Sequence, residues 1–279
     1  MGNTKAIFAT GATIFTAAVT IVACGSDHAA PDAQIVLVDS PVDMAPPIDS
    51  PPDAPSFDFS CSGNSAPTAG SNFTVTGNVQ EVALQGTQPS IGPLADAAMT
   101  LCTGNCSGGN NLGSASTDAS GNFSIGPNAT MGSAVDAYVR MTHTGDRTVL
   151  AFPSSPFTGD TVQPIITFQD IIIQFGSQFG CDQQAGNGML GLLISDCSNM
   201  PITDGSRLTI SVQQNGSDVG DPPIDAGGLS QMAAGFYLVC NVPPGTTTVG
   251  AKYDNMALRS HDVETTAGTT TETIVRPGF

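Results

Sequence analysis

Six cysteines in the body of this chain are the residues best suited to chemistry: Cys61, Cys102, Cys106, Cys181, Cys197 and Cys240. An even number of cysteines is typical of a disulfide framework when the chain is exported, which its N-terminal leader indicates. The short spacing of Cys102 and Cys106 predicts a loop clip. We further expect Cys197–Cys240 within the C-terminal half and, as the remaining pair, Cys61–Cys181 near a domain boundary.

These thiols also have two alternative uses, as ligands of a structural zinc ion or as a catalytic nucleophile. A structural zinc site needs paired Cys or His at short spacing on two separate turns, and only Cys102 and Cys106 have such spacing. Gly104-Asn-Cys106-Ser-Gly108 matches the G-x-C-x-G sequence pattern of a nucleophile elbow, but a true elbow lies between a strand and a helix. This segment is rich in Gly and Asn, so a disulfide-bonded loop is the favoured interpretation and we expect no catalytic residue here.

The body of the chain also holds two histidines and three tyrosines: His143, His261, Tyr138, Tyr237 and Tyr253. Their number would allow a ferric site with two Tyr and two His ligands, the set used by intradiol dioxygenases. Only Tyr138 and His143 are close in sequence, however, and they read more simply as a strand residue and a turn residue. No metal ligand is assigned to them.

Calcium is the one cofactor that the sequence leaves open. Asp118, Ser120 and Asn122 occupy alternate positions and carry the oxygen ligands that calcium prefers. The Asp218–Asp225 loop is a similar candidate. An Asx turn, in which Asp118 bonds its own backbone, is the favoured interpretation, so we expect no resident cofactor, with Asp118 and Asn122 as the calcium alternative.

The first 23 residues have the layout of a secretory signal. Lys5 is the only charge before residue 27, and Ala6–Ala23 has neither charge nor proline. The closing Ile21-Val22-Ala23-Cys24 resembles the lipobox of bacterial lipoproteins, in which the cysteine is diacylated and becomes the N-terminus. The resemblance implies a signal peptide over 1–23, lipid attachment at Cys24 and a membrane anchor.

Two alternatives to lipidation remain. Ala6–Ala23 would span about 27 Å as an uncleaved membrane helix, or it is an ordinary signal in which Cys24 is incidental. All three alternatives place residues 25–279 outside the cytoplasm. Gly25 follows Cys24, whereas Asp at that position resembles the inner-membrane retention signal of Gram-negative lipoproteins. We therefore expect the outer membrane, with the chain on its periplasmic or surface face.

The chain is strongly acidic, with a net charge of −17, and only 11% of its residues are charged, against the usual quarter or so. Nucleic acid is excluded as a partner because binding its phosphates requires Lys and Arg. Anionic headgroups are disfavoured for the same reason. Trp is absent and Tyr is scarce, which disfavours a carbohydrate platform based on aromatic stacking, although Phe partly substitutes.

A disordered linker is expected over 24–60, after the lipidated cysteine. It has no Lys or Arg but is rich in proline and in aspartates that repel one another, at positions Asp27, Asp32, Asp39, Asp43, Asp49, Asp53 and Asp58. Proline favours an extended path, and like charges extend it further. Too little apolar material is present for a core.

From Cys61 onward, short alternating or apolar runs separated by Gly, Pro, Asn and Asp turns predict an all-β protein of sandwich type. The expected strands are Phe73–Val79, Ala97–Leu101, Gly121–Ile125, Val135–Met141, Thr148–Phe152, Ile165–Phe175, Met189–Ile194, Leu208–Val212, Gly235–Cys240, Thr247–Tyr253 and Thr271–Val275. Ala97–Leu101 would also suit one helical turn. A weak internal similarity predicts two tandem sandwiches, at 61–178 and 179–279.

Three segments resemble carboxypeptidase regulatory-like, transthyretin-like and CnaB-type domains. Ser116–Ser124 resembles their T-D-x-x-G-x-F/Y turn, Gly191–Ser195 with Leu208–Val212 their opening strands, and Asn241–Gly245 with Thr247–Ala251 their V-P-P-G element. The resemblance implies two Ig-like or transthyretin-like β-sandwiches. Some CnaB-type domains carry a Lys–Asn crosslink, but Lys252 is the only lysine after residue 60, so no crosslink is expected.

These observations together predict a lipid-anchored cell-envelope protein with a non-enzymatic structural, adhesive or binding role. Its partner would be a protein or a glycan, besides the membrane that holds its lipid. One alternative is a tethered extracytoplasmic enzyme, a hydrolase or metal oxidase, which would need His143 or His261 in a cleft with an acid or a nucleophile. Another is an accessory module of a larger envelope assembly.

Overall fold

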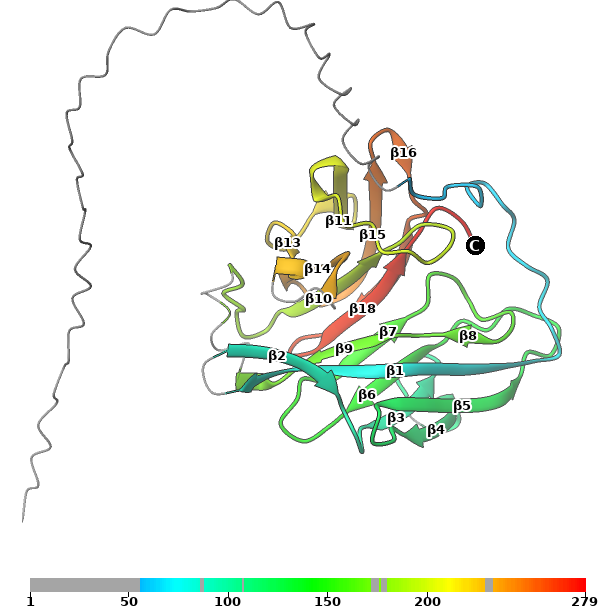
Figure 1. The fold of residues 1–279 in the computed structure, drawn as a ribbon. Coiled ribbons are helices and arrows are strands. Elements are labelled where there is room, and N and C mark those ends of the chain that lie inside the picture. Colours follow the sequence, from blue (N-terminus) through cyan, green and yellow to red (C-terminus); the bar gives the residue numbers. More distant parts are fainter. Residues whose placement is uncertain (1–55, 86–87, 107, 172–175, 177–179, 229–232) are drawn as a thin grey trace, which may run out of the picture. The chain divides into compact units, whose positions relative to one another are not determined.

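A computed structural model describes residues 56–85, 88–106, 108–171, 176, 180–228 and 233–279 (Figure 1). The predicted signal peptide, Cys24 and the linker up to residue 55 lie outside these residues. The described residues belong to one compact unit made of β-strands and turns, and the predicted all-β fold is confirmed. Short 3-10 turns lie at Gly108–Asn110, Gly205–Arg207 and Ala226–Gly228.

An eight-stranded central sheet runs through the unit. In spatial order its strands are β13 (Ile224–Asp225), β14 (Phe236–Val242), β10 (Gly188–Ile194), β18 (Thr270–Val275), β7 (Val149–Phe152), β6 (Tyr138–Thr142), β3 (Ala98–Cys102) and β4 (Asn111–Ser116). The last strand in sequence, β18, lies in the middle and runs parallel to both of its neighbours, β7 and β10. It therefore connects strands that are far apart in the chain.

Two five-stranded sheets accompany the central one. The first consists of β1 (Asn72–Gln85), β2 (Gln88–Pro93), β5 (Asn122–Ala129), β8 (Thr161–Val162) and β9 (Ile165–Phe168). The second consists of β11 (Leu208–Gln214), β12 (Ser217–Asp218), β15 (Gly245–Tyr253), β16 (Met256–Ala257) and β17 (His261–Thr265). In the first sheet, β1 is long enough to pair with β5 along its first half and with β2 and β9 along its second.

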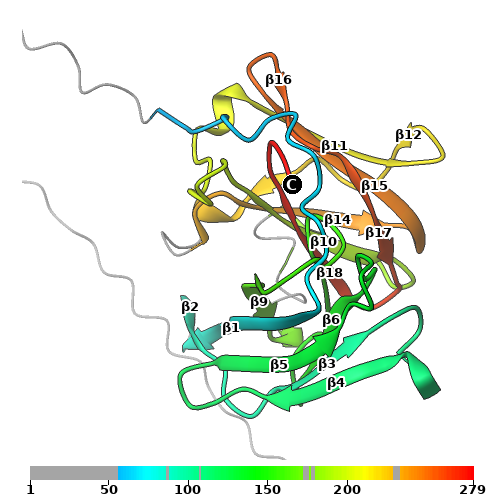
Figure 2. The ribbon, with the colours of Figure 1, turned by 90° about the vertical axis from the view of Figure 1, so that its right-hand side faces the viewer.

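The two five-stranded sheets pack on opposite faces of the central sheet. Successive side chains of a strand point to opposite faces, and β10 shows this directly. Leu190, Leu192 and Ile194 lie in a core with the second sheet, whereas Met189 lies in a cluster with Val82 and Phe168 of the first sheet. Figure 2 shows β10, β14 and β18 between β1 on one side and β11 and β15 on the other.

A further core lies between the first sheet and β3, β6 and β7. Its largest fully buried side chains are Phe73, Phe157, Met99, Leu101, Ile125, Met141 and Ile165. Phe73 and Phe157 stack with their ring centroids 5.1 Å apart. Burial on this scale contributes about 1.5–3 kcal/mol for each large apolar side chain relative to exposure.

Most of the predicted strands overlap strands of the structure. The prediction for Ile165–Phe175 was too long, because β9 ends at Phe168; its residues 172–175 lie outside the described residues. Ala97–Leu101, left open as strand or helix, is strand β3. The prediction for Val135–Met141 was wrong at its start, because Val135 forms an isolated bridge with Phe157 and β6 begins only at Tyr138. The strands β2, β4 and β17 were missed because polar residues, glycine or proline interrupt their apolar pattern.

Hydrogen bonding crosses the predicted domain boundary between residues 178 and 179. The strand pair β7–β18 joins Val149–Phe152 to Thr270–Thr273. Two of the cores nevertheless draw mainly on one predicted domain each. The position of the boundary itself stays a prediction.

Gly191 provides a test of the central sheet. A Cβ at this position in β10 would overlap the Phe236 ring and lie 3.0 Å from Cγ of Glu272. We expect Gly191→Ala to lower the free energy of unfolding by about 1–3 kcal/mol. In a unit of this size that is a loss of several degrees in Tm.

Gly92→Ala is the matched control, because Gly92 also lies in a strand but its Cβ would meet nothing within 4 Å. It should change stability by no more than about 0.5 kcal/mol. Thermal and urea unfolding followed by circular dichroism measure both variants. Equal stability of the two would contradict the close packing at Gly191.

Candidate functional site

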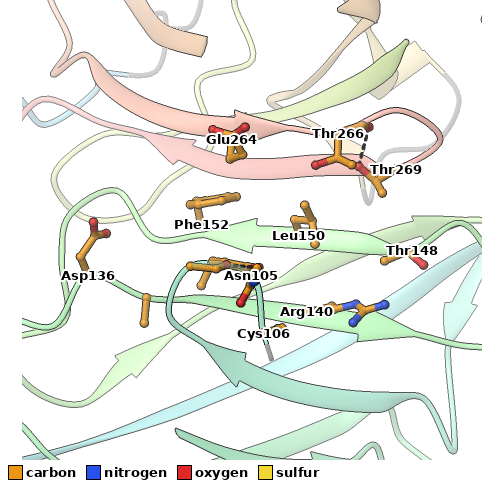
Figure 3. Close-up of a pocket in the computed structure, with 13 residues that line it drawn as sticks. Asn105, Cys106, Asp136, Arg140, Thr148, Leu150, Phe152, Glu264, Thr266 and Thr269 are labelled. Atoms are coloured by element: carbon orange, nitrogen blue, oxygen red, sulfur yellow. Dashed lines mark hydrogen bonds between the residues drawn. The ribbon is translucent and has the colours of Figure 1, made fainter. Parts of the chain in front are cut away.

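The central sheet has an open face over β6 and β7, and this face is the candidate site. Val139 pairs with Ala151, and both side chains lie in the first core. Arg140 pairs with Leu150 and both point the opposite way, because alternate residues face opposite sides. A cavity of about 630 Å³ opens there beside β17 (Figure 3). We call it the trough.

The floor of the trough is aromatic and fixed. Tyr138 and Phe152 stack with centroids 4.7 Å apart and planes 22° apart. The Tyr138 hydroxyl donates to the Gly104 carbonyl at 2.7 Å, and the disulfide Cys102–Cys106 closes the same loop. Burial raises the pKa of Tyr138, so its hydroxyl stays a neutral donor at pH 7.

The walls of the trough are polar. Figure 3 shows Leu150 and Phe152 along β7, with Thr148 just before the strand, between Glu264 on one side and Asn105 and Cys106 on the other. Glu264 accepts a hydrogen bond from the Thr246 hydroxyl at 3.2 Å. Arg140 is exposed and makes no ion pair with any described residue. Flat rings, hydroxyls and one free guanidinium suit reversible binding of a polar partner.

Sequence reasoning missed the trough as a site. Its members come from positions far apart in the chain, such as Arg140, Phe152 and Glu264. The pairing of β6 with β7 and of β7 with β18, and the contact of β18 with β17 of the second sheet, bring them together. The available signal was the alternation in Tyr138-Val-Arg-Met-Thr142. Val139 and Met141 suit a buried face, whereas Tyr138, Arg140 and Thr142 indicate that the other face of the strand is not part of an apolar core.

A second feature lies where the expected linker meets the folded unit. Cys61 is disulfide-bonded to Cys197, with Cα atoms 5.6 Å apart. The Cys197 N–H donates to the Asp58 carbonyl at 2.8 Å, and the Asp58 N–H donates to the Asp196 carboxylate at 2.9 Å. The Ser198 hydroxyl donates to the Asp58 carboxylate at 3.1 Å. We call residues 57–61 with 196–198 the clamp.

The clamp is also held by aromatic packing. Phe57 meets Tyr253 edge-on with centroids 5.3 Å apart, and Phe59 stacks on the same ring at 5.7 Å. Both phenylalanines pack against the core of the second sheet. Hydrogen bonds from Ser60 lower the pKa of Asp58 and keep it ionised. Residues 57–60 of the predicted linker 24–60 therefore contact the folded unit; the bounds of the linker stay a prediction.

All six candidate cysteines are disulfide-bonded, but two predicted pairings were wrong. Cys102 pairs with Cys106 as expected, whereas Cys61 pairs with Cys197 and Cys181 with Cys240. The reason is the antiparallel pairing of β10 and β14, which sets Val242 beside Gly188 at the start of β10. Cys240 is thus close to Cys181, which precedes β10, while Cys197 follows the far end of that strand.

Among the other candidate residues, Asp118, Asn122, His143 and His261 each have a hydrogen-bond partner. Asp118 accepts the N–H groups of Ser120 and Asn122 at 2.9 and 2.8 Å, as in an Asx turn. His143 bonds Asp146 at 2.6 Å, and His261 bonds Thr273 at 2.7 Å. No cluster of three or more His, Cys, Asp or Glu able to hold a metal exists among the described residues. Calcium binding at Asp118 and Asn122 stays untested.

No protein-family model and no curated protein matches this chain. Among solved structures it is similar to the Bacillus anthracis TIE protein, with 12% identity and a TM-score of 0.23, over 74% of this chain but only 35% of that one. It is also similar to the shaft pilin SpaA of Lactobacillus rhamnosus GG, with 10% identity, a TM-score of 0.22 and coverage of 75% and 98%. A third is GBS52, a minor pilin of Streptococcus agalactiae, with 11% identity, a TM-score of 0.23 and coverage of 73% and 95%. Structural similarity at these TM-scores supports no conclusion about the family or the function of this chain.

A buried carboxyl that the sequence did not single out lies beside the first core. Asp146 is 8% exposed and bonds His143, and Glu81 lies next to it. Gln169 donates to the Glu81 carboxylate at 2.9 Å. Burial, with the neighbouring negative charge, raises the pKa of Asp146 to about 6. The folded chain therefore binds a proton here that the unfolded chain releases.

This shift predicts a pH dependence of stability. Because the pKa of Asp146 is raised on folding, its contribution favours folding at acidic pH and is lost as the pH rises through about 6. Asp146→Asn stays neutral throughout. We expect the variant to be more stable than the wild type by about 1–3 kcal/mol at pH 7.5 and by a smaller margin at pH 4.5.

Urea unfolding at the two pH values measures this difference. Asp182→Asn, at an exposed position, is the control and should show the same offset from the wild type at both. If the stability difference between Asp146→Asn and the wild type became smaller as the pH rises, the effect would have the opposite sign. That result would refute a raised pKa at Asp146.

Proposed function

We propose that this chain is a lipid-anchored, non-enzymatic protein of the bacterial cell envelope. It displays a compact β unit on an acidic tether and has a structural, adhesive or binding role. The observation that carries the proposal is the clamp, because it ties the residues next to the expected tether into the core by a disulfide, hydrogen bonds and two aromatic contacts.

The clamp gives the tether a firm attachment. A pull along the chain from Cys24 would reach the folded unit at residues 57–61. The Cys61–Cys197 bond, with a sequence separation of 136, passes that load directly to the end of β10. A disulfide closing so long a loop also stabilises the fold by about 4–5 kcal/mol in the chain-entropy account. This arrangement suits a protein that must hold a partner against force.

The three disulfides support an oxidising compartment, as the signal sequence does. Among the described residues no helix is long and apolar enough to cross a membrane. Attachment through lipid at Cys24 fits both observations, with the outer membrane as the proposed location. Two acyl chains on one cysteine would give a stable anchor.

The trough is the proposed surface for a protein or glycan partner. Its stacked Tyr138 and Phe152 offer an apolar floor, and Arg140 offers a charge-assisted hydrogen bond. The net charge of −17 disfavours nucleic acid as the partner.

Replacing Cys24 tests the anchor. We expect the wild type in the membrane fraction, with an intact mass that starts at Cys24 and includes diacylglycerol and acyl groups. Cys24→Ser should lack that mass and appear in the soluble fraction, because the acceptor thiol is gone. The double variant Cys102→Ser/Cys106→Ser is the control and should remain lipidated and membrane-bound.

A Cys24→Ser protein that keeps residues 1–23 and stays in the membrane would show an uncleaved helix in place of a lipid anchor. A wild type that is cleaved but soluble would show an ordinary signal. Either result would refute the proposal.

A further inference from the structure

A second cavity, of about 860 Å³, lies on another part of the unit. It is bounded by the segment 67–70, the loop 153–164 and the ends of β10 and β18. Arg276 has the only cationic side chain that lines it, and Asp160 the only acidic side chain. The Asp160 carboxylate already accepts the Thr74 N–H at 2.8 Å. We call this space the arginine cavity.

Arg276 lines the cavity and Arg259 is adjacent to it, and neither has an anionic partner among the described residues. The Arg259 N–H donates to the Arg276 carbonyl at 2.9 Å, and the Arg259 guanidinium donates to the Ser154 carbonyl at 2.9 Å. It also lies 3.7 Å from the centroid of the Phe279 ring. Neither arginine forms an ion pair with any described residue. In a chain with 7 basic and 24 acidic residues, two adjacent unpaired arginines are unexpected.

The electrostatic state of the pair favours an added anion. Burial lowers the pKa of Arg276, and burial and the charge of Arg276 lower the pKa of Arg259. Both effects express the cost of holding positive charge in a partly dry place without a counter-charge. A carboxylate beside Arg276 would remove much of this cost and is the group that a planar guanidinium binds in a bidentate manner.

Unpaired donors line the same cavity. Ser195 is 1% exposed, yet its hydroxyl has no hydrogen-bond partner among the described residues. The Nε of Arg276 is buried and has none either, although its Nη1 donates to Asn199 at 3.3 Å. Buried polar groups are seldom left unpaired in folded proteins. Ser195 and Arg276 both line the cavity, so these unpaired donors belong to side chains next to the space that a ligand would occupy.

We propose that the arginine cavity binds a sugar that carries a single carboxylate. The remaining lining combines hydroxyl and amide side chains, such as Thr158, Thr161 and Gln163, with apolar groups that include four prolines, Val162, Leu193, Ile274 and Phe279. Hydroxyls and amides match sugar hydroxyls, and proline rings match the apolar faces of a sugar ring. The volume falls in the range of ligand pockets, about 300–1,000 Å³.

The overall charge explains why one carboxylate is preferred. A net charge of −17 repels a polyanion at long range, whereas a single carboxylate gains more from the short-range bonds to Arg276 than it loses. The inference rests on the proposed function, because the acidic sugar would be one component of the glycan partner proposed there. The site itself depends only on the folded unit and not on the anchor.

Titration of the full chain in mild detergent with glucuronate tests the site, by calorimetry or by ligand-observed NMR. Glucose is the neutral counterpart and acetate the carboxylate without a sugar. We expect saturable binding of glucuronate with a Kd of about 1 mM or tighter and weaker binding of both others. Arg276→Gln should weaken glucuronate binding at least about tenfold.

Two further variants separate the effect of the Arg276 guanidinium from a general effect of positive charge. Lys252→Gln removes one exposed positive charge far along β15 and should bind glucuronate as the wild type does. Arg276→Lys keeps the charge without the planar fork and should bind with intermediate strength. Thermal melting shows whether each variant is folded, so a loss of binding in a folded Arg276→Gln protein is specific.

Three results would overturn the inference: no saturable binding of glucuronate to the wild type, equal binding by Arg276→Gln, or acetate or glucose binding as tightly as glucuronate. These results are distinct from a failure of the proposed function. A membrane-bound chain that does not bind glucuronate refutes only the sugar site, whereas a soluble, unlipidated chain that binds it refutes only the anchor.

Discussion

The backbone hydrogen bonding of β18 to β7 and to β10 is the interaction on which the rest of the structure depends. These two parallel pairings join Val149–Phe152, Thr270–Val275 and Met189–Ile194 into one sheet. Glu272 lies at this junction, 3% exposed, and accepts the Ile166 N–H from the first sheet at 3.1 Å. Burial raises the pKa of Glu272 well above its usual range, which favours the neutral carboxyl where the sheets meet.

Each candidate site follows from this shared sheet. The trough exists because the two covering sheets lie on opposite faces, which leaves the face of β6 and β7 that carries Arg140 open beside β17. The clamp fixes residues 57–61 next to the end of β10. The arginine cavity lies at the ends of β10 and β18, where Ser195 and Arg276 follow the paired strands. All three sites are therefore held by the same hydrogen-bonded frame.

The sequence predicted local structure well and long-range pairing poorly. Alternation in segments such as Phe73–Val79 and Leu208–Val212 reports which face of a strand is buried, so the all-β fold was within reach. The Cys102–Cys106 clip needed only its spacing. The other two disulfides depend on the direction of β14 relative to β10, and the trough depends on the position of β18. Neither is encoded in local periodicity, because both are set by which strands pair between segments that are far apart in the chain.

Differential scanning calorimetry of the disulfide-intact chain tests the shared sheet most directly. If β18 joins both halves through one continuous sheet, the unit should unfold in a single transition, with a ratio of calorimetric to van't Hoff enthalpy of about 1. Two resolved transitions, or a ratio near about 2, would show two independent sandwiches and would contradict the account.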